Sequence, residues 1–338
     1  LHSLASASTI TWLIHQKFEL SIPLYRQEKE WEALGLRLSR ATMSNWLLVV
    51  YRDWLVHIVH RLKLELLKQR YLHIDETHVQ VLKEPGRKNT SDSYMWVYCS
   101  IRDAVNPIRY FEYQPGRSGK YPEAFLREYE GYIHTDAYSG YNAVSGVKRC
   151  LCYTHLRRAF VDALPKDIHN SEASKPAEAI LRLNQLFNIE SELEALPPDQ
   201  KKKERLIREK PLLEAFWSWA EKSAIGELPK SKLSKAFHYA LNNREGFWNY
   251  LEDGNCSISN SLAENCIRPF VIGRKNWLFS GSPKGAEASA GIYTLVETAK
   301  ANGLAPMKYI KYILSDMPGS AFLEHPEYLD DYLPWNPL

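Results

Sequence analysis

Cysteine is scarce in this sequence of 338 residues. The five cysteines are odd in number and include no Cys-x-x-Cys pair. Such a set indicates neither a disulfide framework nor a four-cysteine zinc knot, and it is typical of a protein in a reducing compartment. The five are Cys99, Cys150, Cys152, Cys256 and Cys266.

Long apolar runs and a strong charge of either sign are also missing. No apolar stretch reaches the roughly 18 residues of a membrane span, and the chain does not open with a basic stretch followed by an apolar one. We therefore expect a cytoplasmic protein with no membrane partner. The formal net charge of +3 permits a nucleic-acid partner without requiring one. Because the first residue is Leu1 and not methionine, we expect a piece of a longer product.

The first 70 residues have helical apolar spacing and predict an all-α segment. Gly35 is placed to end a helix over 25–34, and Ser39 to cap the next helix, over 40–52. This outline predicts a helix-turn-helix-like DNA-binding segment, and 10 basic against 6 acidic residues give it a charge of +4. An ordinary helical hairpin with a solvated face fits the pattern equally well. In the DNA-binding interpretation, base edges would be contacted by Arg40, Thr42 and Asn45.

From residue 71 the pattern changes to short runs rich in β-branched and aromatic residues, which predict strands. The predicted order is three strands, a helix, a strand, and then a strand and a helix again. These elements cover residues 71–82, 94–101, 108–114, 120–129, 132–136, 148–153 and 154–164. The order indicates a mixed α/β layered arrangement and resembles the ribonuclease H-like fold, with its first part over 71–164.

The remainder of the chain is predicted to be mainly helical. Residues 165–255 predict a helical insertion, in which prolines 197, 198, 211 and 229 are expected to break helices. Its lysine run, 201–203, is expected to lie on a solvated helix face, with phosphate contact as the alternative. The last part of the core is expected over 256–318, with helices over 286–302 and 306–316, and a C-terminal extension over 319–338.

An aspartate lies inside the first predicted strand, in the run YLHIDETHV. Burying an unpaired carboxylate is costly, so Asp75 at this position favours a bound cation. The alternative is a strand bulge in which the carboxylate accepts from backbone amides. Glu76 follows it and would point to the opposite face, so only one of the two acids can join a given site.

A second aspartate, Asp136, ends the fourth predicted strand in YIHTDAYSGYN, at the end where open sheets bind ligands. An Asx-turn or a helix N-cap is the alternative interpretation. His73 and His134 precede the two aspartates with the same spacing. A zinc site, and with it a zinc hydrolase, therefore stays open, formed by His73, Asp75, His134 and Asp136.

The third acid, Glu264, lies in SNSLAENCIRPF, a predicted helix that Pro269 is expected to limit. Asn260, Glu264 and Arg268 would form one polar stripe. Ser261 and Glu264 also have the spacing of a capping box, and spacing alone favours that cap.

The segment after Glu264 is basic and aromatic, with few acids. Cations of this kind can position phosphates, and a tryptophan face can stack on an unpaired base. Trp277 as an ordinary core residue is the alternative. The segment contains Arg268, Arg274, Lys275, Trp277, Phe279 and Lys284.

Three carboxylates on different elements suit phosphodiester chemistry. Two Mg²⁺ ions roughly 3.5–4 Å apart can activate an oxygen nucleophile and stabilise the leaving oxygen. Magnesium takes hard oxygen ligands and keeps several waters, so a few carboxylates suffice, and Mn²⁺ is expected to substitute. The three acids are therefore candidates for such a two-metal site, beside the alternative given for each.

In order along nearly the whole chain, these motifs resemble the transposases of the insertion sequence 66 family. The matching runs include HIDETHVQVL, YMWVY, DAYSGYN, CYTHLRRAF and IRPFVIGRKNWLFSGSPKGAEASAGIYTLVETAKANGLAPMKYIKYIL. The resemblance implies that Asp75, Asp136 and Glu264 are the catalytic, metal-binding acids of a ribonuclease H-like core. It also implies strand cleavage and joining at the terminal inverted repeats of the element itself.

The same resemblance implies the partners and the place of action. We expect the inverted repeats and target DNA as substrates, a homodimer when two ends are paired, accessory proteins of the same element, and association with a bacterial nucleoid. Family members usually carry an upstream zinc-binding segment, and commonly an arginine directly after the glutamate, where this chain has Asn265. An inactive remnant that acts as a DNA-binding protein through residues 1–70 is therefore the alternative function.

Overall fold

The computed structural model describes residues 5–165 and 174–336, and the fold is mixed α/β, as the sequence predicts. The chain divides into two compact units. The first comprises residues 1–69, 74–126 and 262–338, and the second comprises residues 70–73 and 127–261. Strand β1 (Tyr71–Val81) therefore begins in the second unit and continues in the first. Among the described residues, no helix is both long and apolar enough to cross a membrane.

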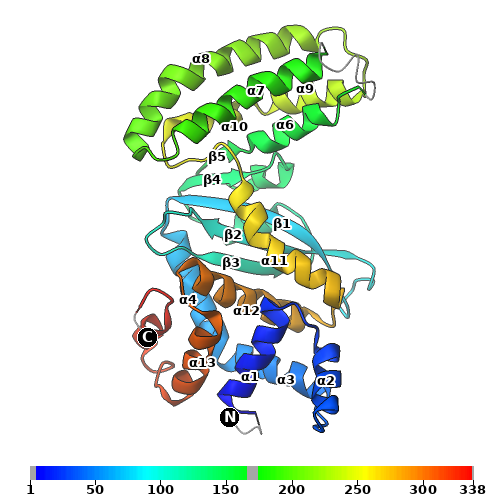
Figure 1. The fold of residues 1–338 in the computed structure, drawn as a ribbon, viewed down its shortest axis with the longest axis vertical. Coiled ribbons are helices and arrows are strands. Elements are labelled where there is room, and N and C mark those ends of the chain that lie inside the picture. The colour runs from blue at the N-terminus through cyan, green and yellow to red at the C-terminus, as the bar shows by residue number, and fades with distance from the viewer. Residues whose placement is uncertain (1–4, 166–173, 337–338) are drawn as a thin grey trace. The chain divides into compact units, whose positions relative to one another are not determined.

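Helices form the N-terminal part of the first unit (Figure 1). They are α1 (Ala7–Ile14), α2 (Leu24–Ala33), α3 (Arg40–Val50) and α4 (Val56–Leu67). Gly35 follows α2 in the left-handed conformation with φ of 84°. Ser39 Oγ accepts a hydrogen bond from the Thr42 amide at the start of α3. Both predicted helix signals are therefore confirmed.

The sequence predicts a helix over 40–52, and α3 ends close to that, at Val50, but no loop follows it. A π-helical turn, Tyr51–Leu55, joins it directly to α4. Helix α12 (Pro283–Ala301) packs closely on this turn. A Cβ built on Gly291 would lie only 2.1 Å from the Tyr51 ring. Glycine in α12 permits this contact, which lies far along the chain from residue 52, so local signals did not predict the continuation.

The strands of the first unit are β2 (Asp92–Ser100), β3 (Arg109–Gln114), the short β6 (Phe279–Ser280) and most of β1. Strands β2 and β3 pair antiparallel, and β6 pairs in parallel with β1. Helix α12 packs on β3 (Figure 1), where Thr294 Oγ1 and Thr298 Oγ1 accept from the amides of Phe111 and Arg109. The unit also contains α5 (Lys120–Phe125), α11 (Ser261–Trp277) and α13 (Pro306–Asp316).

The second unit contains two parallel strands and a layer of helices. Strand β4 (Gly131–Thr135) pairs in parallel with the start of β1 and with β5 (Val147–Leu151). The strand order is thus β3-β2-β1-β4-β5, with β6 also on β1. The helices are α6 (Tyr153–Val161), α7 (Lys175–Glu192), α8 (Pro198–Ala224), α9 (Lys232–Asn242) and α10 (Arg244–Trp248).

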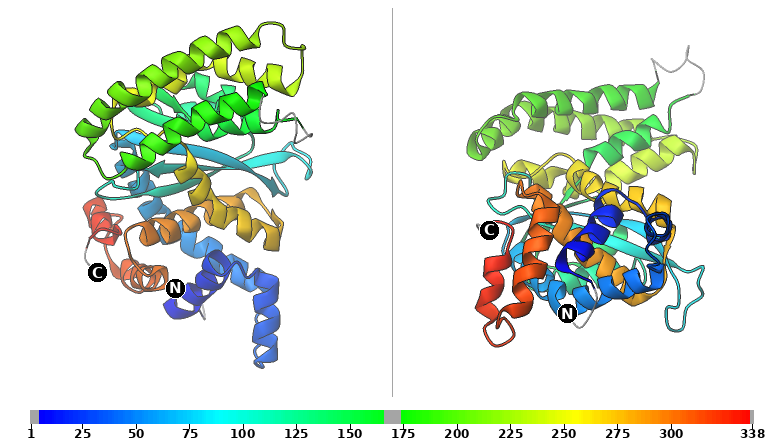
Figure 2. Two further views of the ribbon diagram at one scale, coloured as in Figure 1. Left: turned by 45° about the horizontal axis from the view of Figure 1, so that its top comes forward. Right: turned by 60° about the horizontal axis from the view of Figure 1, so that its bottom comes forward.

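Aromatic side chains form the core of this helical layer, which is seen from two further directions in Figure 2. Phe160, Phe216 and Phe237 meet edge to face at its centre, and Trp217 is fully buried beside them. Edge-to-face contacts of this kind add about 0.5–1.5 kcal/mol per pair beyond the burial of apolar area. The predicted helical character of residues 165–255 is confirmed for the part described, 174–255.

Two prolines that were expected to stop helices lie inside them. Pro211 lies within α8 and Pro269 within α11, so both predictions were wrong. An internal proline removes one helix hydrogen bond, at a cost of about 3 kcal/mol. Buried side chains on both helices offset that cost, Leu213 and Trp217 on α8 and Phe270 on α11. The predicted break at residues 197 and 198 is confirmed, because α8 begins there.

Candidate functional site

Asp75 lies on β1 in the first unit and is half-buried. Its Oδ1 accepts a hydrogen bond from the Glu76 amide at 2.9 Å, so the backbone contact considered for this aspartate is present. The Glu76 side chain is 2% exposed and forms an ion pair with Arg117 at 2.6 Å. Successive strand residues point to opposite faces, so the two acids have different surroundings. Arg117 thus engages Glu76, and the role of Asp75 as a metal ligand stays a prediction.

Asp136 directly follows β4 in the second unit, and its Oδ1 accepts from the Tyr138 amide at 2.9 Å. The Asx-turn considered for this residue is therefore present. Arg149 on β5 organises the same turn. Its Nη2 donates to the carbonyls of Asp136 and Tyr138 at 2.6 and 2.8 Å, and its Nε donates to Thr135 Oγ1 at 2.8 Å. These bonds fix the backbone that carries Asp136.

Sequence reasoning missed Arg149. The available signal was a half-buried charged residue inside a short strand, Val147–Leu151, which also contains Lys148. Such a side chain needs partners nearby. Only the parallel pairing of Ile133 with Arg149 shows that the partners lie at the end of β4.

His73 and His134 are neighbours on the paired strands β1 and β4, which explains their repeated spacing before the aspartates. Their rings stack with centroids 4.1 Å apart and planes 10° from parallel, and both residues are buried. His73 Nδ1–H donates to Asn260 Oδ1 at 2.9 Å. Asn260 is 1% exposed and precedes α11, whereas Arg268 is exposed on that helix, so the predicted polar stripe of Asn260, Glu264 and Arg268 is not formed.

Glu264 lies in the first turn of α11, in the first unit, and is half-buried. The exposed face of this helix is formed by Asn265, Arg268, Ile272 and Lys275, whose spacing of three, four and three residues keeps them on one side. Two cations therefore project from one helix face. We refer to these four residues as the α11 face.

Arg274 lies on another side of α11. Its Nη1 donates to Thr77 Oγ1 on β1 at 3.1 Å, and burial lowers the pKa of its guanidinium. The bond attaches α11 to β1 two residues after Asp75. Arg274 is therefore already engaged with the protein, whereas Arg268 and Lys275 are exposed.

Trp277 at the end of α11 packs edge to face on Phe270, with ring centroids 5.4 Å apart. It is half-buried, and it lies close to Tyr293 of α12. The exposed apolar side chains nearby are Leu278 and Phe279, at 64% and 45%. The stacking of Trp277 on a nucleic-acid base stays a prediction.

The three residues expected to contact base edges, Arg40, Thr42 and Asn45, are all exposed at the start of α3. Glu28 on α2 accepts from the Arg40 amide at 3.0 Å, so the two helices are joined at this turn. Exposure is necessary for DNA contact, and the contact itself stays a prediction.

The candidate acids are divided between the units, with Asp75 and Glu264 in the first and Asp136 in the second. Carboxylates are the hard oxygen donors that Mg²⁺ prefers, so the chemistry of this donor set fits the expected metal. The molecule is thus an α/β protein with three candidate metal-binding acids on different elements and two exposed cations on the α11 face.

The family model described as "Transposase IS66 family" matches residues 2–288. The chain belongs to this family, as its motifs indicate, and all three candidate acids lie within the matched range.

Curated relatives come from Sinorhizobium fredii (strain NBRC 101917 / NGR234). The chain is 26% identical over 344 residues to the uncharacterized protein y4hP, covering 96% of this chain and 60% of that protein. It is 27% identical over 354 residues to the uncharacterized protein y4qI, covering 97% of this chain and 62% of that protein. The chain thus spans about three fifths of the length of these relatives. No solved structure gives a significant match.

Proposed function

We propose that the chain is the catalytic part of a transposase, which cleaves and joins DNA strands at the terminal inverted repeats of its own insertion sequence. The observation that carries this proposal is the family match over residues 2–288, which includes Asp75, Asp136 and Glu264. We further propose the ribonuclease H-like fold, and the strand order β3-β2-β1-β4-β5 supports it. The predicted segments 1–70, 71–164, 165–255, 256–318 and 319–338 are proposed as the functional divisions of the chain.

In this proposal Asp75, Asp136 and Glu264 hold two Mg²⁺ ions, for which Mn²⁺ can substitute. When bound, such ions activate an oxygen nucleophile and neutralise charge on the leaving oxygen. The task of the protein is to orient the acids. Arg149 fixes the turn at Asp136, and Arg274 attaches α11, which carries Glu264, to β1.

DNA is the proposed partner, both as element ends and as target. The exposed cations Arg268 and Lys275 on the α11 face can position phosphates, while Arg40 and Asn45 on α3 are exposed where base edges would be contacted. We also propose that the chain forms a homodimer when the two ends of the element are paired. Accessory proteins of the same element are further proposed partners.

Strand cleavage tests the proposal directly. The substrate is a duplex with the inverted repeat that flanks the gene, and the variants are Glu264→Gln and Asp75→Asn, with the exposed Glu324→Gln as a matched control. With Mg²⁺ we expect the parent and the control to cleave, and we expect both active-site variants to lose at least about 100-fold in rate, because each removes a metal-binding charge. Equal cleavage by the parent and Glu264→Gln would contradict the assignment.

An inactive DNA-binding remnant is the second candidate, and Asn265 favours it. This residue is exposed on the α11 face directly after Glu264, where the family commonly has an arginine. If the parent binds end DNA without cleaving it in Mg²⁺ or Mn²⁺, and Asn265→Arg restores cleavage, the remnant function is supported. If the parent cleaves, it is excluded.

A further inference from the structure

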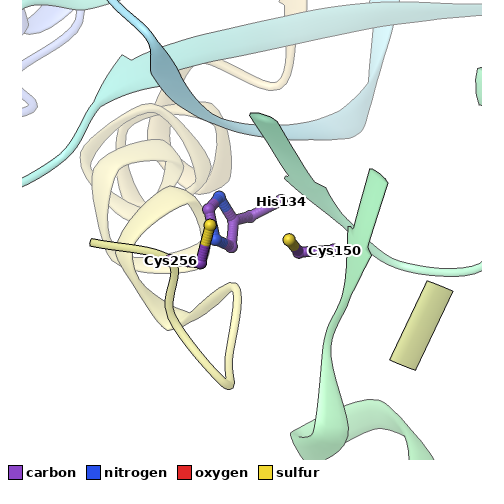
Figure 3. Close-up of side chains that lie close together, drawn as sticks. All are labelled: His134, Cys150 and Cys256. Atoms are coloured by element: carbon purple, nitrogen blue, oxygen red, sulfur yellow. The ribbon is translucent and has the colours of Figure 1, made fainter. Parts of the chain in front are cut away.

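A buried histidine and two buried cysteines of the second unit form a cluster that the proposed function does not use. A ring nitrogen of His134 and the sulfurs of Cys150 and Cys256 all lie within 4.8 Å of one another. Each of the three residues is 1% exposed. In Figure 3 the sulfur of Cys150 extends from β5 towards the imidazole on β4, and Cys256 lies on the loop beside that ring. Three separate segments therefore bring atoms of metal-ligand type together.

We propose that His134, Cys150 and Cys256 bind one zinc ion, in a site distinct from the proposed magnesium site. Zinc accepts two cysteines and one histidine as three of its four ligands, and a water can complete the tetrahedron. At zinc distances of about 2.0–2.3 Å, neighbouring ligand atoms lie about 3.5–3.8 Å apart. Atoms that already lie within 4.8 Å need to approach by only about 1 Å.

Charge supports zinc at this buried position. An isolated charge in a protein interior is strongly disfavoured. Two thiolates and one neutral imidazole carry a total charge of −2, which balances a divalent ion. A monovalent soft ion on the same ligands would leave a net negative charge among side chains that are almost completely buried. The ligand set therefore matches Zn²⁺ in both softness and charge.

The orientation of His134 is also that of a zinc ligand. Its Nδ1–H donates to the Leu72 carbonyl at 3.1 Å, which leaves the lone pair on Nε2. Metal-bound histidines usually donate their other ring N–H to a carbonyl or carboxylate in this way. Nε2 accepts from the Ser257 amide at 2.9 Å, so zinc binding requires this hydrogen bond to open and the chain at Cys256 to adjust.

Ordinary packing is the alternative explanation of the cluster. Free cysteine is among the most buried residue types, so two buried cysteines alone need no metal. The two backbone hydrogen bonds of His134 account for its tautomer, so the observation that favours a metal is the approach of three ligand atoms from three separate segments. A zinc ion would join β4, β5 and the loop before α11, and so fix the backbone two residues before Asp136.

Metal content of the purified full chain tests the site. Protein from zinc-supplemented cells is passed over a weak chelating resin, which removes loosely bound metal. The zinc content per chain is then measured by inductively coupled plasma mass spectrometry. We expect about one zinc per chain in the parent, in Cys266→Ser, whose cysteine is the least buried of the five, and in Glu264→Gln. We expect less than about a tenth of that in Cys150→Ser and Cys256→Ser. Absence of stoichiometric zinc from the parent, or equal zinc in all variants, would overturn the proposal.

Two measurements on the parent keep the test valid if a cysteine variant does not fold. Co²⁺ added alone to the metal-free chain should give the intense thiolate charge-transfer absorption of a tetrahedral site. Zinc should also protect Cys150 and Cys256 from alkylation, mapped by peptide mass spectrometry, while Cys266 reacts equally with and without zinc. A Cys150–Cys256 disulfide in freshly isolated protein, or unprotected thiols, would refute the site. Zinc retained by Glu264→Gln separates this inference from the proposed function.

Discussion

Arg149 on β5 donates from Nη2 to the backbone carbonyl of Asp136 at 2.6 Å. The same guanidinium also holds Tyr138 and Thr135, so one planar group fixes three points of a single turn. Lysine carries the same charge but cannot form this fork. We therefore infer that Arg149 is a positioning residue, which acts on the proposed chemistry through Asp136.

Replacing this arginine should raise the Mg²⁺ concentration that cleavage requires while leaving the chain folded. We expect Arg149→Lys to need about 10–100-fold more Mg²⁺ for half-maximal strand cleavage, the usual effect of losing a group that orients a metal ligand. The measurement is a Mg²⁺ titration of the cleavage rate, with circular dichroism as the check on folding.

Arg157→Lys is the matched control for this titration. Arg157 lies on the neighbouring helix α6, where its Nε donates to Asn184 Oδ1 at 2.8 Å. Its replacement should leave the Mg²⁺ requirement unchanged. If Arg149→Lys lowers the rate but keeps the parental Mg²⁺ requirement, its role is only structural.

Local signals predicted much of this fold. The caps at Gly35 and Ser39 and the β-rich runs from residue 71 depend on neighbouring residues, and they were located to within a few positions. Contacts between distant segments were missed. The close contact of Gly291 with the Tyr51 ring joins two distant segments, and the fork of Arg149 depends on strand pairing.

The candidate sites show the same contrast between features that neighbouring residues determine and features that distant segments form together. Asp75 and Asp136 could be singled out as candidates from the sequence, because a carboxylate in or after an apolar strand is unusual, whatever surrounds it; their role stays a prediction. The cluster of His134, Cys150 and Cys256 was not, because its cysteines are 106 positions apart (256 − 150) and match no short zinc motif. Spacing rules detect ligands that share a turn or a helix, and they do not detect ligands that a sheet and a distant loop bring together.

The α11 face predicts how binding depends on salt. If Arg268 and Lys275 contact phosphates, each alanine substitution should weaken binding of end DNA and of unrelated DNA alike, and should reduce the logarithmic salt slope by about 1. Binding is measured by fluorescence anisotropy over a range of salt concentrations. Lys235→Ala on α9 is the control and should keep the parental slope. Loss of affinity for end DNA alone would indicate base recognition instead.

A buried ion pair stabilises the helical layer of the second unit. Arg205 on α8 is fully buried and donates to both carboxylate oxygens of Glu190, at 2.6 and 2.8 Å. It also donates to the carbonyls of Tyr250, Asp253 and Cys256, at 3.1, 3.0 and 2.8 Å. Arg205 therefore connects α8 to the loop that carries Cys256.

Breaking this pair should be strongly destabilising. We expect Arg205→Met to lower the free energy of unfolding by about 3–5 kcal/mol, because the buried Glu190 keeps only the longer contact with Lys201, at 3.4 Å, as a charge partner. Arg208→Met, one turn along the same helix, removes only the exposed pair with Glu192 and should change nothing measurable. Urea unfolding of the three proteins checks both expectations. Similar losses in the two variants would show that the burial of the pair does not matter.

A second carboxylate near the same arginine predicts a pH dependence. Burial, with the charge of Glu190, raises the pKa of Glu209 to about 8 from 4.5. Tyr250 donates to Glu209 Oε2 at 2.6 Å, and glutamine can keep that bond. Between about pH 5 and pH 8 the folded chain keeps a proton that the unfolded chain has released. Stability should therefore fall as the pH rises through this range, with a slope of up to about 1.4 kcal/mol per pH unit.

Glu209→Gln removes this titration, so its unfolding free energy should change less between pH 5 and pH 8 than that of the parent. The variant should be the more stable of the two at pH 8, because it does not have to keep a proton on a buried carboxyl group. Urea unfolding at several pH values measures the difference, and Glu214→Gln, exposed on the same helix, should follow the parental curve. Parallel curves for the parent and Glu209→Gln would mean that Glu209 is ionised in the folded chain.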